Sequence, residues 1–129
     1  MNNGFIELAD IAALDRFIDS SATAPVVILK HSRTCGVSDR AYTELSGLAL
    51  PADSEGAPVA AAPIAIVTVQ TARDVSNELE ARTGIAHQSP QALIFVDRKV
   101  VWTASHWAVK AGAVREALRA ASEPAGSQR

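Results

Sequence analysis

The sequence has 129 residues, about the length of a single domain, and is 48% hydrophobic but only 5% aromatic, so its core must consist mainly of aliphatic side chains. Its formal net charge is −2 with acidic and basic residues interleaved, which excludes the clustered basic surface typical of proteins that bind nucleic acid. The single cysteine, Cys35, excludes an internal disulfide and favours a reducing compartment.

No segment predicts secretion or membrane insertion. The first residues lack the basic region followed by an apolar one that a secretory signal needs. The longest apolar run, residues 57–67, is interrupted by Pro58 and Pro63 and is far shorter than the roughly 20 residues of a membrane span. We therefore expect a cytoplasmic protein that does not bind a membrane.

The first half of the chain predicts strands and helices in alternation. Residues 5–8 suit a short strand, and apolar residues at three- and four-residue steps over 8–18 indicate a helix that buries one face. Val26–Leu29 is short, continuous and mostly β-branched, which is typical of a buried strand in a parallel sheet. Polar residues 30–32 end that strand, and apolar residues at helical spacing predict a helix that begins just after Cys35.

A loop, a strand and a helix are predicted next. Residues Pro51–Pro63 are rich in proline and alanine and suit a loop on the surface. Ile64–Val69 resembles the earlier buried strand. Residues 74–82 then have helical spacing, and Gly84 follows as a typical C-terminal stop.

The end of the chain predicts a β-hairpin and a last helix. Two short apolar runs, 92–96 and 100–102, flank a turn that lacks glycine, and helical spacing covers 111–121. The order β-α-β-α-β-α-β-β-α implies an α/β fold whose mixed central sheet is flanked by helices, since alternation makes parallel strands and the hairpin adds antiparallel ones. We expect one domain over 1–121 and a flexible tail over 122–129.

Cys35 is the strongest candidate for a catalytic residue because it stands where a strand gives way to a helix. Unpaired backbone N–H groups and the positive end of the helix dipole favour thiolate over thiol there, and the thiolate is the nucleophile. Arg33, Arg40 and a protonated His31 are expected to add to this effect. The alternative, a buried structural cysteine, is disfavoured by the polar residues on either side.

Ser38 stands three residues after Cys35, at the place where a dithiol redox motif has its second, resolving cysteine. A serine cannot form a disulfide, but its hydroxyl can donate a hydrogen bond to the sulfur. The other reading is a first-turn residue that satisfies the helix backbone, and the two readings are compatible.

Two further segments join the candidate site. Pro90 opens a strand, which a proline tolerates because it gives up no interior hydrogen bond. Ser105, His106 and Trp107 follow the last strand, where Trp107 is either a binding group or a cap over the core. The three histidines and the single cysteine match no zinc-binding spacing, so no metal is expected.

Several segments in fixed order resemble the monothiol bacilliredoxin-like proteins, redox proteins of the thioredoxin superfamily that act with the small thiol bacillithiol. The matching segments are 30–32, 34–38, 75–78, 87–92 and 104–107. The resemblance implies a thioredoxin-like fold with Cys35 as the sole catalytic residue. It also implies a cis Ser89-Pro90 bond facing the cysteine, and substrate contacts from Thr34, Gly36, Ser89, Pro90, Ser105, His106 and Trp107.

The activity implied by the resemblance is a monothiol thiol-disulfide exchange that removes bacillithiol or a similar small thiol from capped cytosolic proteins. No cofactor is bound; an external small thiol is the co-substrate, and a partner redoxin or reductase is a further expected partner. Two alternatives stay open. One is a redox-sensing or binding module that is capped at Cys35 without turnover, and the other is a reductase of the arsenate type, which would need more anion-binding groups than Arg33, Arg40 and Arg73.

Overall fold

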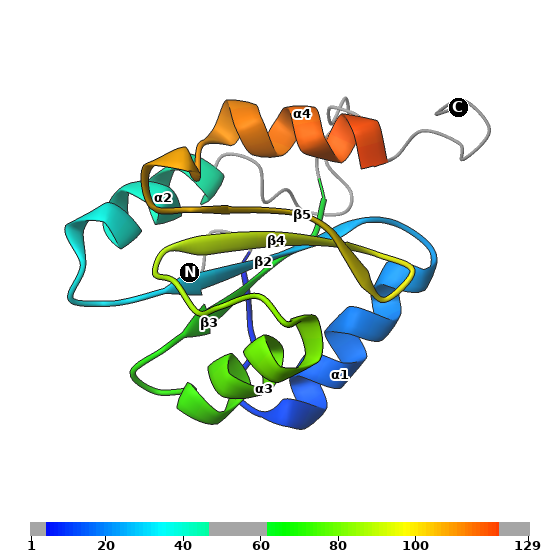
Figure 1. Ribbon diagram of the computed structural model, residues 1–129, viewed down its shortest axis with the longest axis horizontal. Coiled ribbons are helices and arrows are strands. Elements are labelled where there is room, and N and C mark those ends of the chain that lie inside the picture. Colours follow the sequence, from blue (N-terminus) through cyan, green and yellow to red (C-terminus); the bar gives the residue numbers. More distant parts are fainter. Residues whose placement is uncertain (1–4, 47–61, 122–129) are drawn as a thin grey trace.

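The computed structural model describes residues 5–46 and 62–121 and shows a sheet of five strands between two pairs of helices (Figure 1). The strands are β1 (Ile6–Glu7), β2 (Val26–His31), β3 (Ile64–Thr68), β4 (Gln91–Val96) and β5 (Lys99–Ser105). The helices are α1 (Ile11–Asp19), α2 (Gly36–Ser46), α3 (Arg73–Thr83) and α4 (Ala111–Ala121), with short 3₁₀ turns η1 (Ser20–Ala22) and η2 (His106–Ala108).

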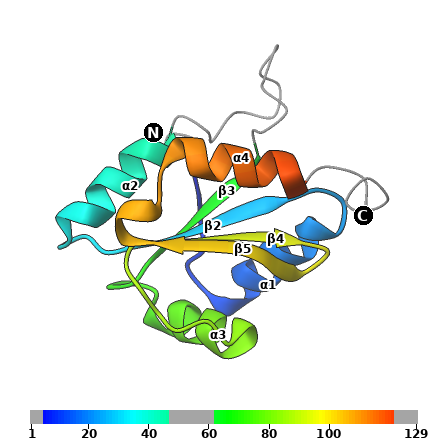
Figure 2. The ribbon, with the colours of Figure 1, turned by 45° about the horizontal axis from the view of Figure 1, so that its top comes forward.

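The sheet is mixed, as the order of elements predicts. Its strands lie in the order β1-β3-β2-β4-β5, in which β1, β3 and β2 are parallel and β4 and β5 are antiparallel to their neighbours. Helices α2 and α4 cover one face and α1 and α3 the other (Figures 1 and 2). This is the thioredoxin-like α/β arrangement, and the carboxyl ends of β2 and β3 meet at one edge of the sheet.

Alternation along the strands divides the aliphatic core into two layers. Val27 and Leu29 of β2 pack under α2 and α4, whereas Val26 and Ile28 point to the opposite face with α1 and α3. All four side chains are buried. Helices cover both faces of the sheet, which explains why β2 is apolar on both sides.

Two strands are longer than their apolar runs predict. Strand β2 continues through Lys30 and His31, which are polar but only 1% and 9% exposed. Strand β5 continues to Ser105, which pairs with Gln91 of β4. The predicted tail 122–129 and all but the last two residues of the predicted loop Pro51–Pro63 lie outside the described residues.

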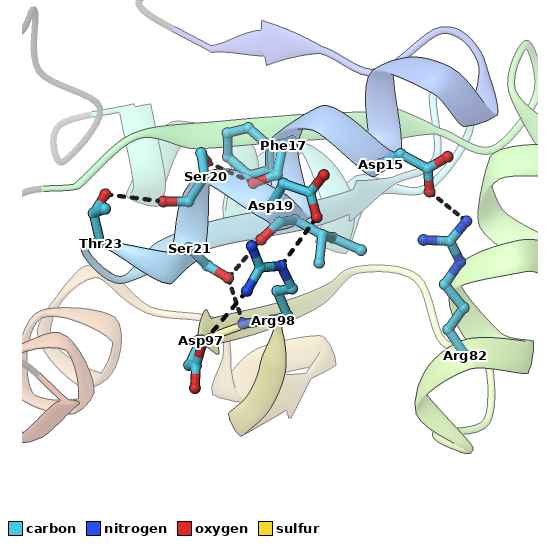
Figure 3. A network of polar contacts seen from close by, with 10 residues as sticks. Asp15, Phe17, Asp19, Ser20, Ser21, Thr23, Arg82, Asp97 and Arg98 are labelled. Carbon is cyan, nitrogen blue, oxygen red and sulfur yellow. Dashed lines mark hydrogen bonds and ion pairs between the residues drawn. The ribbon is translucent and has the colours of Figure 1, made fainter.

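The hairpin turn between β4 and β5 has left-handed backbone at two residues that are not glycine, Asp97 (φ 50°) and Arg98 (φ 67°). Ser21, which is far from this turn in the sequence, makes two hydrogen bonds to it. Its carbonyl accepts the Asp97 N–H at 2.7 Å, and its Oγ accepts the Arg98 N–H at 2.7 Å (Figure 3). The Arg98 side chain also pairs with Asp19. These contacts offset the conformational cost of a turn without glycine.

Replacing Ser21 with alanine is expected to lower the free energy of unfolding by about 1–3 kcal/mol, because the Arg98 N–H then loses its acceptor. Chemical denaturation measures the change. Ser20→Ala is the matched control, since the Ser20 hydroxyl donates to the Phe17 carbonyl but does not contact the hairpin. Equal losses in both variants would show that Ser21 does not hold the turn.

Candidate functional site

Cys35 lies directly before helix α2, at the end of the loop that leaves β2. Its carbonyl accepts the Asp39 N–H at 3.2 Å, so Cys35 occupies the position that caps the helix N-terminus. Its own N–H donates to the Ser32 carbonyl at 3.4 Å, which closes the loop into a turn. The thiol is partly exposed and has no disulfide partner. An attacking group in this place is open to a substrate from outside.

The first turn of α2 lowers the pKa of Cys35 below its ordinary value. The main cause is a hydrogen bond from the Ser38 backbone N–H, and the Val37 N–H and the Ser38 hydroxyl add to it. Partial burial and the nearby carboxylate of Asp39 oppose the shift without reversing it. This direction agrees with the expectation from the sequence, and a lowered pKa increases the thiolate fraction at neutral pH.

The expected help from a protonated His31 needs correction. His31 is only 9% exposed, and this burial lowers its pKa despite the opposing charge of Asp39. The neutral imidazole is therefore favoured at neutral pH. Neither Arg33 nor Arg40 is among the groups that shift the pKa of Cys35. The stabilisation of the thiolate comes from oriented N–H and O–H donors of the helix, not from side-chain cations.

Ser38 contacts both the sulfur and the backbone, but the backbone group that it satisfies is in the loop before Cys35 and not in the helix. It is fully buried, and its Oγ accepts the Ser32 N–H at 3.2 Å, which ties the loop before Cys35 to the first turn of the helix. Because the oxygen accepts from Ser32, the hydroxyl proton remains available to the sulfur, and this hydrogen bond lowers the pKa of Cys35.

Gln70 is a site residue that sequence reasoning missed. It follows β3, and its side-chain amide bridges to the loop before Cys35: Oε1 accepts the Arg33 N–H at 3.1 Å, and Nε2 donates to the Ser32 Oγ at 2.9 Å. A longer contact of 3.4 Å joins Nε2 to the Thr34 hydroxyl. The parallel pairing of β2 with β3 gave a signal, since residues after neighbouring parallel strands meet at one edge.

Replacing Gln70 with methionine, which has a similar shape but cannot make these hydrogen bonds, is expected to loosen the Cys35 loop. The exposed location limits the loss in unfolding free energy to about 1 kcal/mol. We expect a larger relative loss in the rate of Cys35 alkylation at fixed pH, because the loop no longer holds the sulfur at the helix terminus. Thr71→Val is the control, because Thr71 is in the same loop as Gln70 but its hydroxyl donates to the Thr68 carbonyl. An unchanged alkylation rate in Gln70→Met would contradict this role.

The loop before β4 and the turn after β5 join each other beside α2. The Ser89-Pro90 bond is cis, as predicted, and the Pro90 carbonyl accepts the His106 N–H at 2.8 Å. The His106 Nε2 contacts Gln88 Oε1 at 2.7 Å. His106 has a left-handed backbone (φ 57°), and η2 lies against α2 (Figure 2). The structure thus brings two of the predicted segments together.

Trp107 is an exposed side chain and not a cap over the core. It is 59% exposed, and the Arg40 guanidinium of α2 lies 5.6 Å from the centre of its ring. This pair extends the surface from the turn after β5 to the helix that begins at Cys35. The contact that Pro90 is expected to make with the Cys35 sulfur stays a prediction.

The remaining predicted site residues are exposed or partly buried. Thr34 is exposed in the loop before Cys35, and Gly36 is the exposed first residue of α2. Ser89 and Ser105 are half-buried, and the Ser89 hydroxyl lies 3.5 Å from His87 Nε2. Within residues 5–46 and 62–121, no three potential metal ligands come together, and no helix is long and apolar enough to cross a membrane.

Three solved structures share this fold. A protein described, provisionally, as an oxidoreductase with a thioredoxin fold is 28% identical, with a TM-score of 0.74 over 87% of this chain and 91% of that one. Thioredoxin from Fasciola hepatica is 17% identical, with a TM-score of 0.70 over 91% of this chain and 99% of that one. A thioredoxin mutant from Halobacterium salinarum is 15% identical, with a TM-score of 0.71 over 95% of each chain.

The family comparison agrees with the geometry of the site. Residues 6–114 match the model of the monothiol bacilliredoxin BrxC family, a range that includes Cys35 and both loops beside it. The thioredoxin-like fold, the single cysteine and the donors that lower its pKa are all consistent with redox chemistry at a thiol. The chain belongs to the monothiol bacilliredoxin family.

Proposed function

We propose that the protein removes a low-molecular-weight thiol, bacillithiol or a similar one, from capped cytosolic proteins by thiol-disulfide exchange at Cys35. The observation that carries this proposal is a partly exposed cysteine whose pKa is lowered at a helix N-terminus, with Ser38 in the place of a resolving thiol. The Cys35 thiolate attacks the small-thiol sulfur of the mixed disulfide. A new bond forms between the two sulfurs, and the protein thiolate leaves.

The resulting mixed disulfide on Cys35 needs an outside thiol for its release. Cys35 is the only cysteine of the chain, so no internal thiolate is available to attack it. A second small-thiol molecule, or a partner redoxin or reductase, attacks the cap and returns Cys35 as a thiolate. This route accounts for a redox site that has one cysteine and a serine three residues later.

The test uses a model protein whose only cysteine carries the small thiol. Without added thiol, one cap should be released per enzyme, and the mass of the enzyme should rise by one cap. Added small thiol should give sustained turnover. Capping of Cys35 that no outside thiol reverses would favour a redox sensor over an enzyme. Repeated turnover without outside thiol would contradict the monothiol route.

We further propose that Thr34, Gly36, Ser89, Pro90, Ser105, His106 and Trp107 form the substrate-binding surface. The hydrogen bonds of His106 to Pro90 and to Gln88 support this, because they hold the two loops together beside α2. Trp107 adds exposed aromatic surface, to which the small thiol and the surrounding protein can bind.

His106→Ala is expected to raise the KM for the capped protein several-fold and to lower kcat less, because it removes binding that the ground state and the transition state share. Steady-state kinetics with varied capped protein measure both values. Lys110→Ala, an exposed residue between η2 and α4, is the control. A fall in kcat alone would place His106 in the chemical step instead.

A further inference from the structure

A cleft borders the Cys35 loop on the side of the sheet away from Trp107. It has a volume of about 260 Å³ and is lined by residues of β1, β2, β3, α2 and the loop before Cys35. In the sheet order, β1 and β3 lie on one side of β2, whereas β4, β5 and the turn that carries Trp107 lie on the other. None of the predicted substrate-binding residues lines this cleft, and the loop before Cys35 contributes only Arg33 to it.

The cleft has one acidic and one basic side chain on its walls. Glu7 of β1 and Arg33, two residues before Cys35, are both exposed. Among the described residues neither side chain takes part in an ion pair, with the other or with a third group. The charges in the cleft between α1, α3 and the hairpin differ, because Arg82 and Arg98 there pair with carboxylates (Figure 3).

The floor of the cleft combines neutral polar and apolar groups. His31 and Thr68 are partners in the register of β2 and β3, and Ile66 lies two residues before Thr68. The His31 ring packs against Tyr42, with 5.4 Å between ring centres, and its Nδ1 has no hydrogen-bond partner in the described part of the chain. A small cleft with a neutral floor and one charge of each sign complements a small dipolar molecule.

Arg33 on the wall of the cleft is close to Cys35 along the chain. Arg33 is two positions before Cys35, with only Thr34 between them, so their Cα atoms are at most about 7 Å apart. A small thiol linked to Cys35 by a disulfide reaches this distance with a few covalent bonds. The guanidinium of Arg33 has the planar donors that bind a carboxylate, and the carboxylate of Glu7 accepts from an ammonium group.

We propose that this cleft selects the small thiol by its charges, with Arg33 binding a carboxylate and Glu7 an ammonium group of a dipolar aminothiol. This inference rests on the proposed function, since it concerns the cap that is transferred to Cys35. The aromatic surface of Trp107 and the charged cleft then contact different parts of the same small molecule, on the two sides of the sulfur. The cleft, and not the Trp107 surface, distinguishes small thiols by their charges.

Four symmetrical disulfides test the proposal: cystine, with both charges; cystamine, with ammonium only; dithiodipropionate, with carboxylate only; and hydroxyethyl disulfide, with neither. In each reaction the Cys35 thiolate forms a mixed disulfide and releases one thiolate, which intact mass and thiol release both measure. Rates are divided by those of a short neutral peptide with one cysteine at equal thiolate concentration, to remove the intrinsic reactivity of each disulfide. We expect cystine to show the largest normalised rate.

The variants assign each charge. Arg33→Met should slow cystine and dithiodipropionate about tenfold and leave cystamine and hydroxyethyl disulfide unchanged, as expected for loss of a hydrogen bond to a charged group. Glu7→Gln should slow cystine and cystamine only. Arg115→Met removes an exposed cation of α4 outside the cleft and should not alter the order of the four.

Failure of this inference differs from failure of the proposed function. If wild-type protein reacts with all four disulfides and neither Arg33→Met nor Glu7→Gln changes the order, the cleft does not select the thiol, although exchange at Cys35 stands. An equal loss for all four in Arg33→Met would show that Arg33 acts on the thiolate, which also overturns the proposal. No reaction of wild-type protein with any of them would contradict the proposed function itself.

Discussion

Cys35→Ser is expected to reduce disulfide exchange to the uncatalysed background while leaving the fold intact. A hydroxyl at this place is not ionised at neutral pH and does not attack a disulfide, and the chain has no other cysteine. Release of the cap from a capped model protein, followed by mass spectrometry, measures the loss. Substantial activity in this variant would show that another group performs the reaction.

The stability of the same variant separates chemistry from folding. Cys35 occupies the capping position of α2, where serine is a preferred residue because its oxygen accepts backbone N–H groups. We therefore expect the free energy of unfolding of Cys35→Ser to equal that of the wild type or to be slightly higher. Inactivity without loss of stability would then be a property of the missing sulfur.

Much of the fold follows from local pattern because the sheet is covered on both faces. Val26–Leu29 is apolar throughout for that reason, and its length and β-branching suffice to place it as a central strand. The polar residues Lys30 and His31 continue the same strand and are also buried. Their burial depends on elements that are distant in the sequence. A pattern of residue types along the chain does not contain those distant contacts.

The candidate site likewise has a part that the sequence predicts and a part that it does not. The relative position of Cys35 and Ser38 is predictable because they are three residues apart at the first turn of one helix. Gln70 is 35 residues after Cys35 in the sequence, and only the pairing of β3 with β2 brings it to the loop. Glu7 and Arg33 share a cleft for the same reason, through the order of β1, β3 and β2.

Burial also changes the electrostatic role of a residue whose position is predicted correctly. The sequence places His31 close to Cys35, where a cation would stabilise a thiolate. The structure buries the ring against Tyr42, and the lower pKa that results favours its neutral form. The groups that stabilise the Cys35 thiolate are therefore the N–H and O–H donors of the first turn of α2.

Ser38→Ala is expected to raise the pKa of Cys35, because the variant loses the hydroxyl that donates to the sulfur. It should also lower the free energy of unfolding by about 1–3 kcal/mol, since the buried Ser32 N–H loses its acceptor. The pH dependence of alkylation by iodoacetamide measures the first change and chemical denaturation the second. A higher pKa means a smaller thiolate fraction at neutral pH, so exchange should be slower there.

The high-pH limit of the same profile distinguishes two roles for the hydroxyl. Above the pKa of both proteins Cys35 is fully thiolate, and a thiolate of higher pKa is intrinsically more nucleophilic, so Ser38→Ala should react there at least as fast as the wild type. Ser46→Ala is the control: this hydroxyl lies on the same helix and donates to the Thr43 carbonyl, far from the sulfur, so its profile should match the wild type. If Ser38→Ala reacts more slowly by the same factor at every pH, Ser38 positions the loop without stabilising the thiolate.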